Sequence, residues 1–185
     1  MSIKPEGFKK EICGECGQAK TYLLALDRGT TVIVSAFAAA VRKKGINIIH
    51  PKKEMEVHGK EWNLKLANSE GVLTSTQIGN LTRARVHGLL ARVKNEAGNW
   101  CMTTKGAQFL KNIPVPRFAI MRKSTAEHRS HKDEYFEPEH YTITASELAL
   151  EGENWAAIDF QIVDGRIVYD LPPPKAETKQ STLPC

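Results

Sequence analysis

Residues 73–110, LTSTQIGNLTRARVHGLLARVKNEAGNWCMTTKGAQFL, decide the fold expected for this chain. A threonine stands before each of the first two helical patterns in this stretch, and threonine is a frequent N-cap residue. Thr74 is expected to cap a short helix over 75–80, and Thr82 a second helix over 83–94, in a helix-turn-helix layout. The apolar residues of the second helix share one face and should pack inward: Val86, Leu89, Leu90 and Val93.

A hairpin and a closing helix are predicted at the end of the same stretch. Gly98 and Asn99 are typical turn residues, and the apolar run Trp100–Met102 leads out of the turn as a strand. Thr104 is expected to cap a last helix over 105–110.

A longer helix is predicted before this stretch, over residues 30–44, with Thr30 or Thr31 as its N-cap. Gly45 is expected to end that helix. Residues 46–51 are predicted to form a short strand that stops at a proline, and residues 52–71 a loop or a second pair of strands.

The order helix, turn, helix, two-stranded wing, helix resembles the winged-helix family of DNA-binding domains over residues 28–112. The run WCMTTKGAQFL is similar to the wing strand and the following helix of that family. The resemblance implies that the second helix of the pair enters the major groove and that the wing lies near the DNA backbone. The residues expected to contact DNA are Thr82, Arg83, Arg85, His87, Arg92, Lys94 and Asn99.

Charge is unevenly distributed along the chain, whose net charge is +5. Residues 42–112 hold 13 Lys/Arg against 5 Asp/Glu, whereas residues 113–185 hold 8 against 12. A basic middle favours a polyanionic partner such as double-stranded DNA. Charge alone is equally compatible with a solvated surface that has no partner.

Cys13 and Cys16 have the two-residue gap that lets both thiolates reach one tetrahedral zinc ion. The other two ligands proposed for a structural zinc site are Cys101 and His50, the latter because it closes the predicted strand at 46–51. A redox dithiol and free cysteines are the alternatives. A second, weaker metal pattern consists of His128, His131, Asp133, Glu134 and His140.

The predicted fold class is α+β, with a winged-helix core, an N-terminal Cys-x-x-Cys knuckle and a C-terminal β-rich extension. The extension includes a hairpin over 158–170, in which apolar residues alternate on both sides of Asp164-Gly165. The expected divisions are a knuckle at 1–27, a winged-helix domain at 28–112, a β-rich domain at 113–171 and a disordered tail at 172–185.

The sequence lacks a phosphate-cradling glycine loop, a nucleophile elbow and a His-Glu-x-x-His motif, so we expect no enzyme. It also lacks a secretion signal and a long apolar run, so we expect a cytoplasmic protein without a membrane partner. A cysteine knuckle joined to a winged helix is similar to some phage and prophage proteins. This resemblance implies either a transcriptional regulator or an inhibitor of a host nucleic-acid enzyme, such as RNA polymerase or a CRISPR effector. A homodimer through the C-terminal part is a further expectation.

Overall fold

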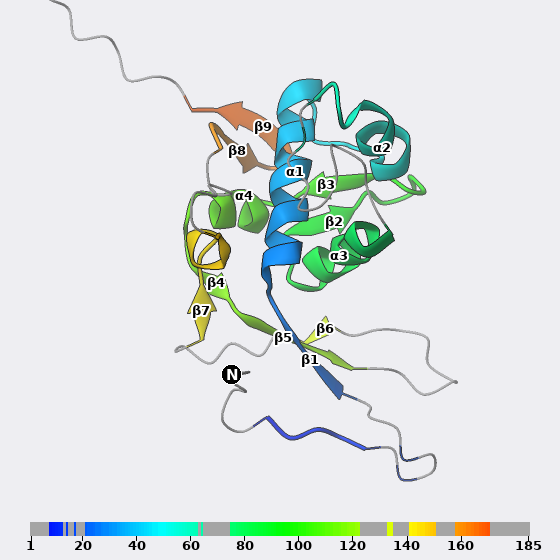
Figure 1. Ribbon diagram of the computed structural model, residues 1–185, viewed down its shortest axis with the longest axis vertical. Coiled ribbons are helices and arrows are strands. Elements are labelled where there is room, and N and C mark those ends of the chain that lie inside the picture. Colours follow the sequence, from blue (N-terminus) through cyan, green and yellow to red (C-terminus); the bar gives the residue numbers. More distant parts are fainter. Residues whose placement is uncertain are drawn as a thin grey trace, which may run out of the picture.

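The computed structural model (Figure 1) describes residues 8–12, 14, 17, 21–62, 64, 75–122, 133–134, 141–150 and 158–170. Helices and small antiparallel sheets are both present, which confirms the mixed α+β class. Cys13, Cys16 and the predicted tail at 172–185 lie outside the described residues. No helix in the described ranges is long and apolar enough to cross a membrane.

Helix α1, Arg28–Lys44, forms the centre of the molecule. Its N-cap is Asp27, whose carboxylate accepts hydrogen bonds from the backbone N–H of Thr30 at 2.9 Å and from its hydroxyl at 2.7 Å. The prediction that Thr30 or Thr31 caps this helix is therefore wrong by three or four positions. Both threonines are buried inside the first turn. The predicted stop at Gly45 is confirmed, with φ at 74°.

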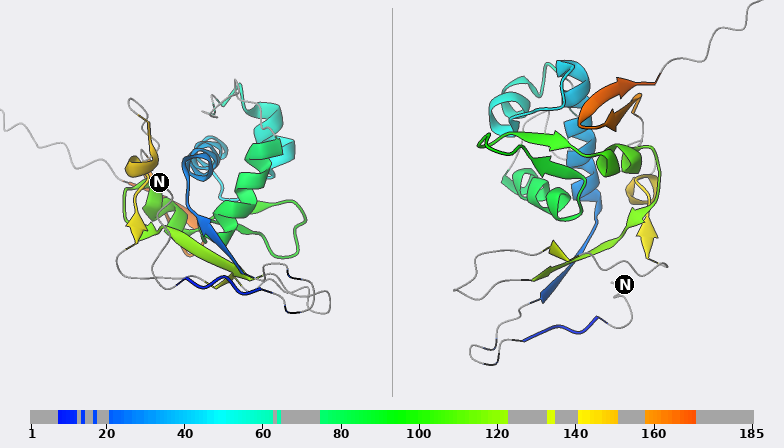
Figure 2. Two further views of the ribbon diagram at one scale, coloured as in Figure 1. Left: turned by 60° about the horizontal axis from the view of Figure 1, so that its bottom comes forward. Right: turned by 180° about the vertical axis from the view of Figure 1, so that it is seen from behind.

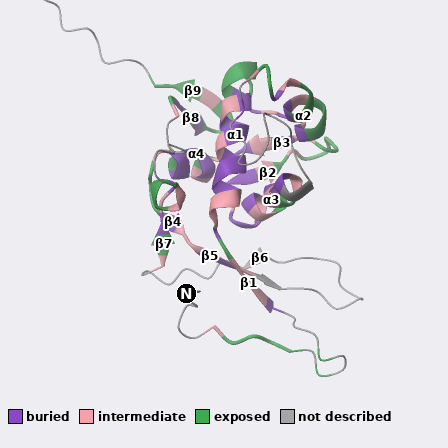
Figure 3. Cartoon of the chain, viewed as in Figure 1, coloured by how far each residue is buried: buried purple, intermediate pink, exposed green. Residues whose placement is uncertain are grey.

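The core forms around α1, because one long side of this helix is apolar. Ile33, Phe37 and Val41 have no exposed surface, and most of the middle of the helix is coloured as buried in Figure 3. Helix α3, Ser75–Val86, packs against one side of α1, and α4, Thr104–Leu110, lies on the other side (Figures 1 and 2). In the view of Figure 2 that is turned by 60°, α1 is seen close to end-on with α3 beside it.

The segment after α1 is helical where a loop or a strand pair was predicted. A π-helical turn, Pro51–Met55, continues into the short helix α2, Glu56–His58. Nδ1 of His50 accepts the backbone N–H of Lys53 at 3.3 Å and caps this turn. Proline is well suited to the first position of a helix, because the N–H that it lacks has no partner there. Pro51 therefore starts a helical segment instead of merely ending a strand.

The two helices predicted over 75–94 are one helix, α3, which is shorter than their sum. Thr82 lies inside this helix and is not an N-cap. Gln77, Leu81 and Ala84 are buried on one continuous face, and a threonine inside a helix costs only a few tenths of a kcal/mol, roughly, relative to better helix formers. The helix therefore continues through Leu81, where a turn between two helices was predicted.

Helix α3 ends at Val86, and Gly88 just beyond it takes a left-handed conformation with φ at 68°. The N–H of Leu89 donates to the carbonyl of Ala84 at 2.9 Å, and that of Gly88 to the carbonyl of Arg85 at 2.9 Å. This pair of hydrogen bonds is a Schellman motif, which satisfies the last carbonyls of a helix. Residues 89–94, predicted as helix, therefore lie beyond its end.

A hairpin of β2, Leu90–Arg92, and β3, Trp100–Met102, follows α3. The strands pair antiparallel with Ala91 opposite Cys101. A strand over 46–51 was predicted, and the structure forms only one bridge there, between Ile49 and Trp100. The predicted turn is confirmed at Gly98, whose φ is 84°.

Helix α4 begins one residue earlier than predicted. Its N-cap is Thr103 and not Thr104, because the Thr103 hydroxyl oxygen accepts the backbone N–H of Gly106 at 3.0 Å. The same hydroxyl donates to the carbonyl of Gly88 at 2.6 Å. One threonine therefore joins the start of α4 to the end of α3.

A three-stranded sheet lies below the helices in Figure 1 and is also separate from them in the view from behind (Figure 2). Its strands are, in order, β1, Thr21–Ala25, β5, Phe118–Arg122, and β6, Asp133–Glu134. Strand β5 lies within residues 113–171, the division that was predicted to be β-rich. Thr21 is opposite Arg122, and Met121 is opposite Asp133.

The C-terminal elements cover the side of α4. Strand β4, Val115–Pro116, pairs with β7, Thr142–Ile143, and a 3-10 turn, Ser146–Leu148, follows. The predicted hairpin is confirmed as β8, Phe160–Val163, and β9, Arg166–Tyr169.

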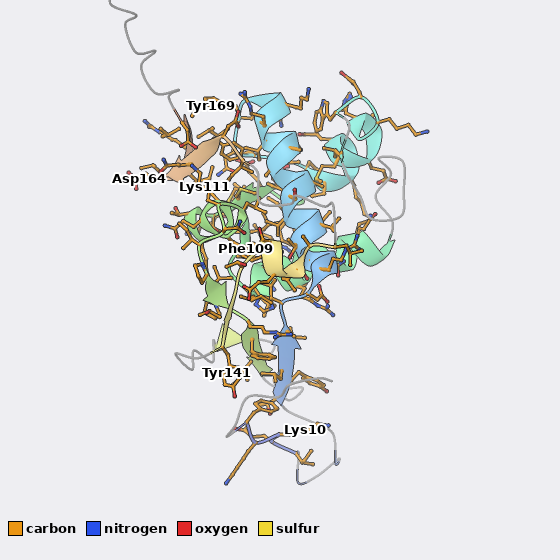
Figure 4. All side chains as sticks on the ribbon, turned by 60° about the vertical axis from the view of Figure 1, so that its left-hand side comes forward. Lys10, Phe109, Lys111, Tyr141, Asp164 and Tyr169 are labelled. Atoms are coloured by element: carbon orange, nitrogen blue, oxygen red, sulfur yellow. The ribbon has the colours of Figure 1, made fainter. Side chains whose placement is uncertain are left out.

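The β8–β9 hairpin is fixed to the rest of the fold by its buried face and by ion pairs. Phe160 and Ile162 are buried, and Lys111 at the end of α4 forms an ion pair with Asp170 at 2.5 Å. Figure 4 shows Lys111 near the hairpin residues Asp164 and Tyr169. Strand β1 of the predicted 1–27 division pairs with β5 of the 113–171 division, and β8 of the latter contacts α4 of the 28–112 division. The domain limits stay a prediction.

Candidate nucleic-acid interface

One surface of the molecule collects exposed polar and cationic side chains from three segments. Thr82 is exposed on α3, Arg92 and Lys94 are exposed on β2 and in the turn after it, and Lys52 is exposed at the start of the π-helical turn. We call these four residues the hairpin face. Among the described residues, no carboxylate forms an ion pair with Lys52, Arg92 or Lys94.

A pocket of about 190 Å³ lies in the middle of the hairpin face, between α3 and the β2–β3 hairpin. Ile78, Leu81 and Trp100 form its apolar lining. The other residues that line it are His50, Pro51, Lys52, Thr82, Arg92 and Gly98. The structure thus brings Thr82 and Arg92, both predicted to contact DNA, to one depression.

The pocket walls are held in place by two close contacts. The Arg92 guanidinium lies over the Trp100 ring, 5.2 Å from its centroid, in a cation–π arrangement. The His50 ring packs on Gly98, where a Cβ atom would come within 2.4 Å of Nε2 of His50. Only glycine leaves room for the imidazole at this point of the turn.

The hairpin turn carries the other predicted contacts. Val93 donates its N–H to the carbonyl of Asn99 at 3.0 Å, which continues the pairing of β2 and β3 by one step. The side-chain amide of Asn99 donates to a carboxylate oxygen of Glu96 at 2.7 Å. Asn99 is therefore engaged within the turn, whereas Lys94 is exposed.

Arg83 was predicted to face DNA and instead forms an ion pair with Asp27. Asp27 also caps α1, so this pair ties α3 to the first turn of the central helix. The Arg83 side chain is 38% exposed, and its charge is already partnered.

His87 was predicted to lie on the outer face, and this prediction is wrong because only 2% of the residue is exposed. Burial, followed by the positive charge of Lys105, lowers the pKa of His87 to about 4. The imidazole is neutral at pH 7 and offers no positive charge to a polyanion. Nε2 of His87 is buried and has no hydrogen-bond partner among the described residues.

Arg85 is half-buried on α3, and its Nε is buried without a partner in the part of the chain that the structure describes. It lies three residues after Thr82, which places both on adjacent positions of one helix side. Arg85 therefore borders the hairpin face.

The four predicted zinc ligands are placed only in part. Cys101 is half-buried on β3, where burial raises the pKa of its thiol, and His50 caps the helical turn with Nδ1. Cys13 and Cys16 are outside the described residues. Among the residues that are described, no three His, Cys, Asp or Glu side chains gather as a metal site.

Of the residues in the second metal pattern, the structure describes Asp133 and Glu134, which form β6. His128, His131 and His140 lie outside the described residues.

Sequence reasoning did not identify Lys52, Ile78 and Trp100 as parts of a site. For Lys52 the sequence did contain a signal: proline favours the first turn of a helix, so Pro51 indicates that a helical turn begins there. Comparisons with protein-family models, with curated proteins and with solved structures find no match for this chain. The geometry of the hairpin face is therefore the basis for a functional assignment.

Proposed function

We propose that this protein binds double-stranded DNA through the hairpin face, with an arrangement like that of a winged helix. The observation that carries the proposal is the pocket between α3 and the β2–β3 hairpin, which gathers Lys52, Thr82 and Arg92 from three segments. Cations without carboxylate partners are suited to phosphates, and a threonine hydroxyl is suited to either phosphates or base edges.

The order of elements supports the winged-helix comparison. Helix α1 is followed by a bridge at Ile49, a helical segment from Pro51, helix α3 and the β2–β3 hairpin. In this proposal α3 is the helix that enters the major groove, and the hairpin is the wing. The groove-facing residue is then Thr82, flanked by Arg85, because Arg83 is paired with Asp27 and His87 is buried.

The phosphate contacts are assigned to Lys52, Arg92 and Lys94. Each phosphate that a protein neutralises steepens the dependence of log K on log salt concentration by about 0.9 for duplex DNA. The wild-type protein should therefore bind a duplex with a salt slope near 2.7 in magnitude, roughly, if all three side chains contact phosphates.

The test is a fluorescence-anisotropy titration of a labelled duplex at several salt concentrations. Arg92→Ala and Lys94→Ala should each weaken binding and flatten the slope by about 0.9. Arg166→Ala is the matched control, because Arg166 is an exposed arginine on the β8–β9 hairpin, which does not line the pocket. Equal effects of all three substitutions would show that the hairpin face has no special role.

The alternative predicted from the sequence is a protein partner, such as a host nucleic-acid enzyme. An acidic protein surface would meet the same cations. A pull-down from host lysate after nuclease treatment separates the two functions, because DNA-bridged partners are lost and a direct partner is retained. Retention of one partner by the wild type and its loss in Arg92→Ala would favour the inhibitor function.

We also propose that Cys13 and Cys16 hold a structural zinc ion. The described residues on the two sides of the pair are held together, since the N–H of Glu11 donates to the hydroxyl oxygen of Thr21 at 2.9 Å. A closed segment with a Cys-x-x-Cys motif is the usual form of a zinc knuckle.

Two sources are available for the other ligands. One is the predicted pair Cys101 and His50. The other is suggested by the sheet register: Arg122 and Asp133, the described residues that flank the sequence of His128 and His131, belong to the same sheet as Thr21.

Elemental analysis should find about one zinc per chain, and Cys13→Ser should remove it. The double variant Cys101→Ser/His50→Ala is then compared with His128→Ala/His131→Ala. Zinc should be lost from whichever double variant removes true ligands. A folded wild-type protein without metal contradicts the zinc proposal.

A further inference from the structure

The pocket on the hairpin face has a chemistry that paired DNA does not use. Its walls include Ile78, Leu81 and Trp100, of which the last two are 2% and 7% exposed. A regular duplex presents phosphates, sugars and base edges to a protein, while the faces of its bases stay stacked. Phosphate contacts at the rim therefore leave this apolar depression empty.

The size of the pocket points to a single flat group. Pockets for drug-sized ligands usually measure about 300–1,000 Å³, whereas this one is about 190 Å³. Lys52 and Arg92 also line the pocket, and their positive charges are suited to the phosphates of a nucleotide bound there.

The contact between Arg92 and Trp100 provides a stacking platform. The guanidinium carbon of Arg92 lies 5.2 Å from the centroid of the Trp100 indole ring, and guanidinium groups stack on nucleic-acid bases as well as on aromatic rings. Arg92 and Trp100 both line the pocket, so a base inside it would meet both side chains.

We propose that this pocket binds one unpaired base of a DNA duplex, such as a bulged or extruded nucleotide, stacked against Arg92 and Trp100. The inference rests on the proposed function and names the kind of DNA that the hairpin face prefers. Stacking of a base on a protein side chain is worth about 1–3 kcal/mol, which corresponds to a preference of about 5- to 150-fold.

The experiment compares three labelled probes of one sequence by fluorescence anisotropy. The first is a paired duplex, the second carries a one-nucleotide bulge, and the third has an abasic nucleotide at the bulge. The bulged probe should bind about 10-fold more tightly than the abasic one, because the two share the same backbone and differ only in the base.

Two variants locate the effect. Thr82→Phe places a ring at the pocket mouth, and Arg92→Lys keeps the positive charge but removes the flat guanidinium. Both should reduce the ratio of bulged to abasic affinity to about twofold or less. Lys94→Ala is the control, since it should weaken all three probes by a similar factor and leave this ratio unchanged.

The outcomes separate this inference from the proposed function. Binding of the paired duplex together with equal affinity for the bulged and abasic probes overturns the base pocket and leaves the DNA-binding proposal standing. A preference for the bulged probe that survives in both folded variants also overturns the pocket assignment. Absence of binding to all three probes at low salt overturns the proposed function and the inference with it.

Discussion

Two groups of cations come from the same part of the chain and have opposite surroundings. The hairpin face presents Arg92 and Lys94 to solvent, with no carboxylate paired to them among the described residues. The inner cluster, which we define as Asp27, Arg83, His87 and Lys105, lies where α1, α3 and α4 meet. In that cluster one arginine is paired and the histidine is buried and neutral.

The difference shows that the position at which α3 ends decides which cations of this stretch are paired or buried and which are exposed. Side chains before Gly88 are placed by the phase of α3, and those after it by the alternation of β2. Damage to the inner cluster should therefore change folding stability, whereas damage to the hairpin face should change binding.

The largest expected effect is on the pH dependence of stability, through His87. In the folded protein burial lowers the pKa of His87 to about 4, while in the unfolded chain it is near 6.5. The unfolded state thus takes up a proton first as the pH falls, so the contribution is complete above pH 6.5 and is lost towards pH 4. The loss should reach about 3 kcal/mol in the free energy of unfolding.

Urea unfolding of the wild type and of His87→Leu between pH 7.5 and 4 measures this effect. The variant has no imidazole to protonate, and the Nε2 of His87 has no partner to lose among the described residues. The facing charges Lys105, Arg83 and Asp27 are the same in both proteins. Parallel pH profiles for the two proteins would show that His87 is not buried as described.

The second prediction concerns the hairpin face. Arg92→Ala combined with Lys94→Ala should reduce duplex affinity by about 100-fold at low salt and the salt slope by about 1.8. The free energy of unfolding should change by less than about 1 kcal/mol, because both residues are exposed. Circular dichroism and anisotropy on the same samples check both results. A large loss of stability would show that Arg92 and Lys94 support the fold and would contradict their assignment to a binding surface.

The third prediction concerns Gly98, at which the hairpin face depends on backbone shape. Alanine there is disfavoured at a φ of 84°, and its Cβ would collide with the His50 ring. Gly98→Ala should lower the free energy of unfolding by about 1–2 kcal/mol and weaken DNA binding through the displaced pocket wall. Gly165→Ala, at a left-handed turn with open space around it, is the control for backbone strain alone. Unchanged DNA binding by Gly98→Ala would show that the pocket wall formed by His50 is not needed for DNA binding.

The sequence was informative where a signal was local and unopposed. Gly45 ends α1 as predicted, and Asp164-Gly165 turns the β8–β9 hairpin as predicted. These positions require left-handed backbone, which few residues other than glycine and asparagine or aspartate adopt.

The candidate site was harder to predict, because two patterns competed within residues 82–94. The apolar residues Val86, Leu89 and Val93 fit helical spacing, and this pattern concealed the Schellman stop at Gly88. With the helix extended too far, His87 was assigned to the surface. The pocket itself depends on Lys52 and Thr82 meeting across 30 residues of chain, which no local pattern expresses.

The smallest expected effect tests whether Arg83 belongs to the inner cluster or to the hairpin face. Arg83→Ala removes the ion pair with Asp27, whose members are 38% and 42% exposed, so the free energy of unfolding should fall by only about 0.5 kcal/mol. Asp27 keeps its hydrogen bonds to Thr30, and the cap of α1 survives. Duplex affinity should change less than twofold, although Arg83 lies one position from Thr82. Thermal unfolding and anisotropy measure the two quantities, and a tenfold loss of affinity with normal stability would return Arg83 to the DNA-binding surface.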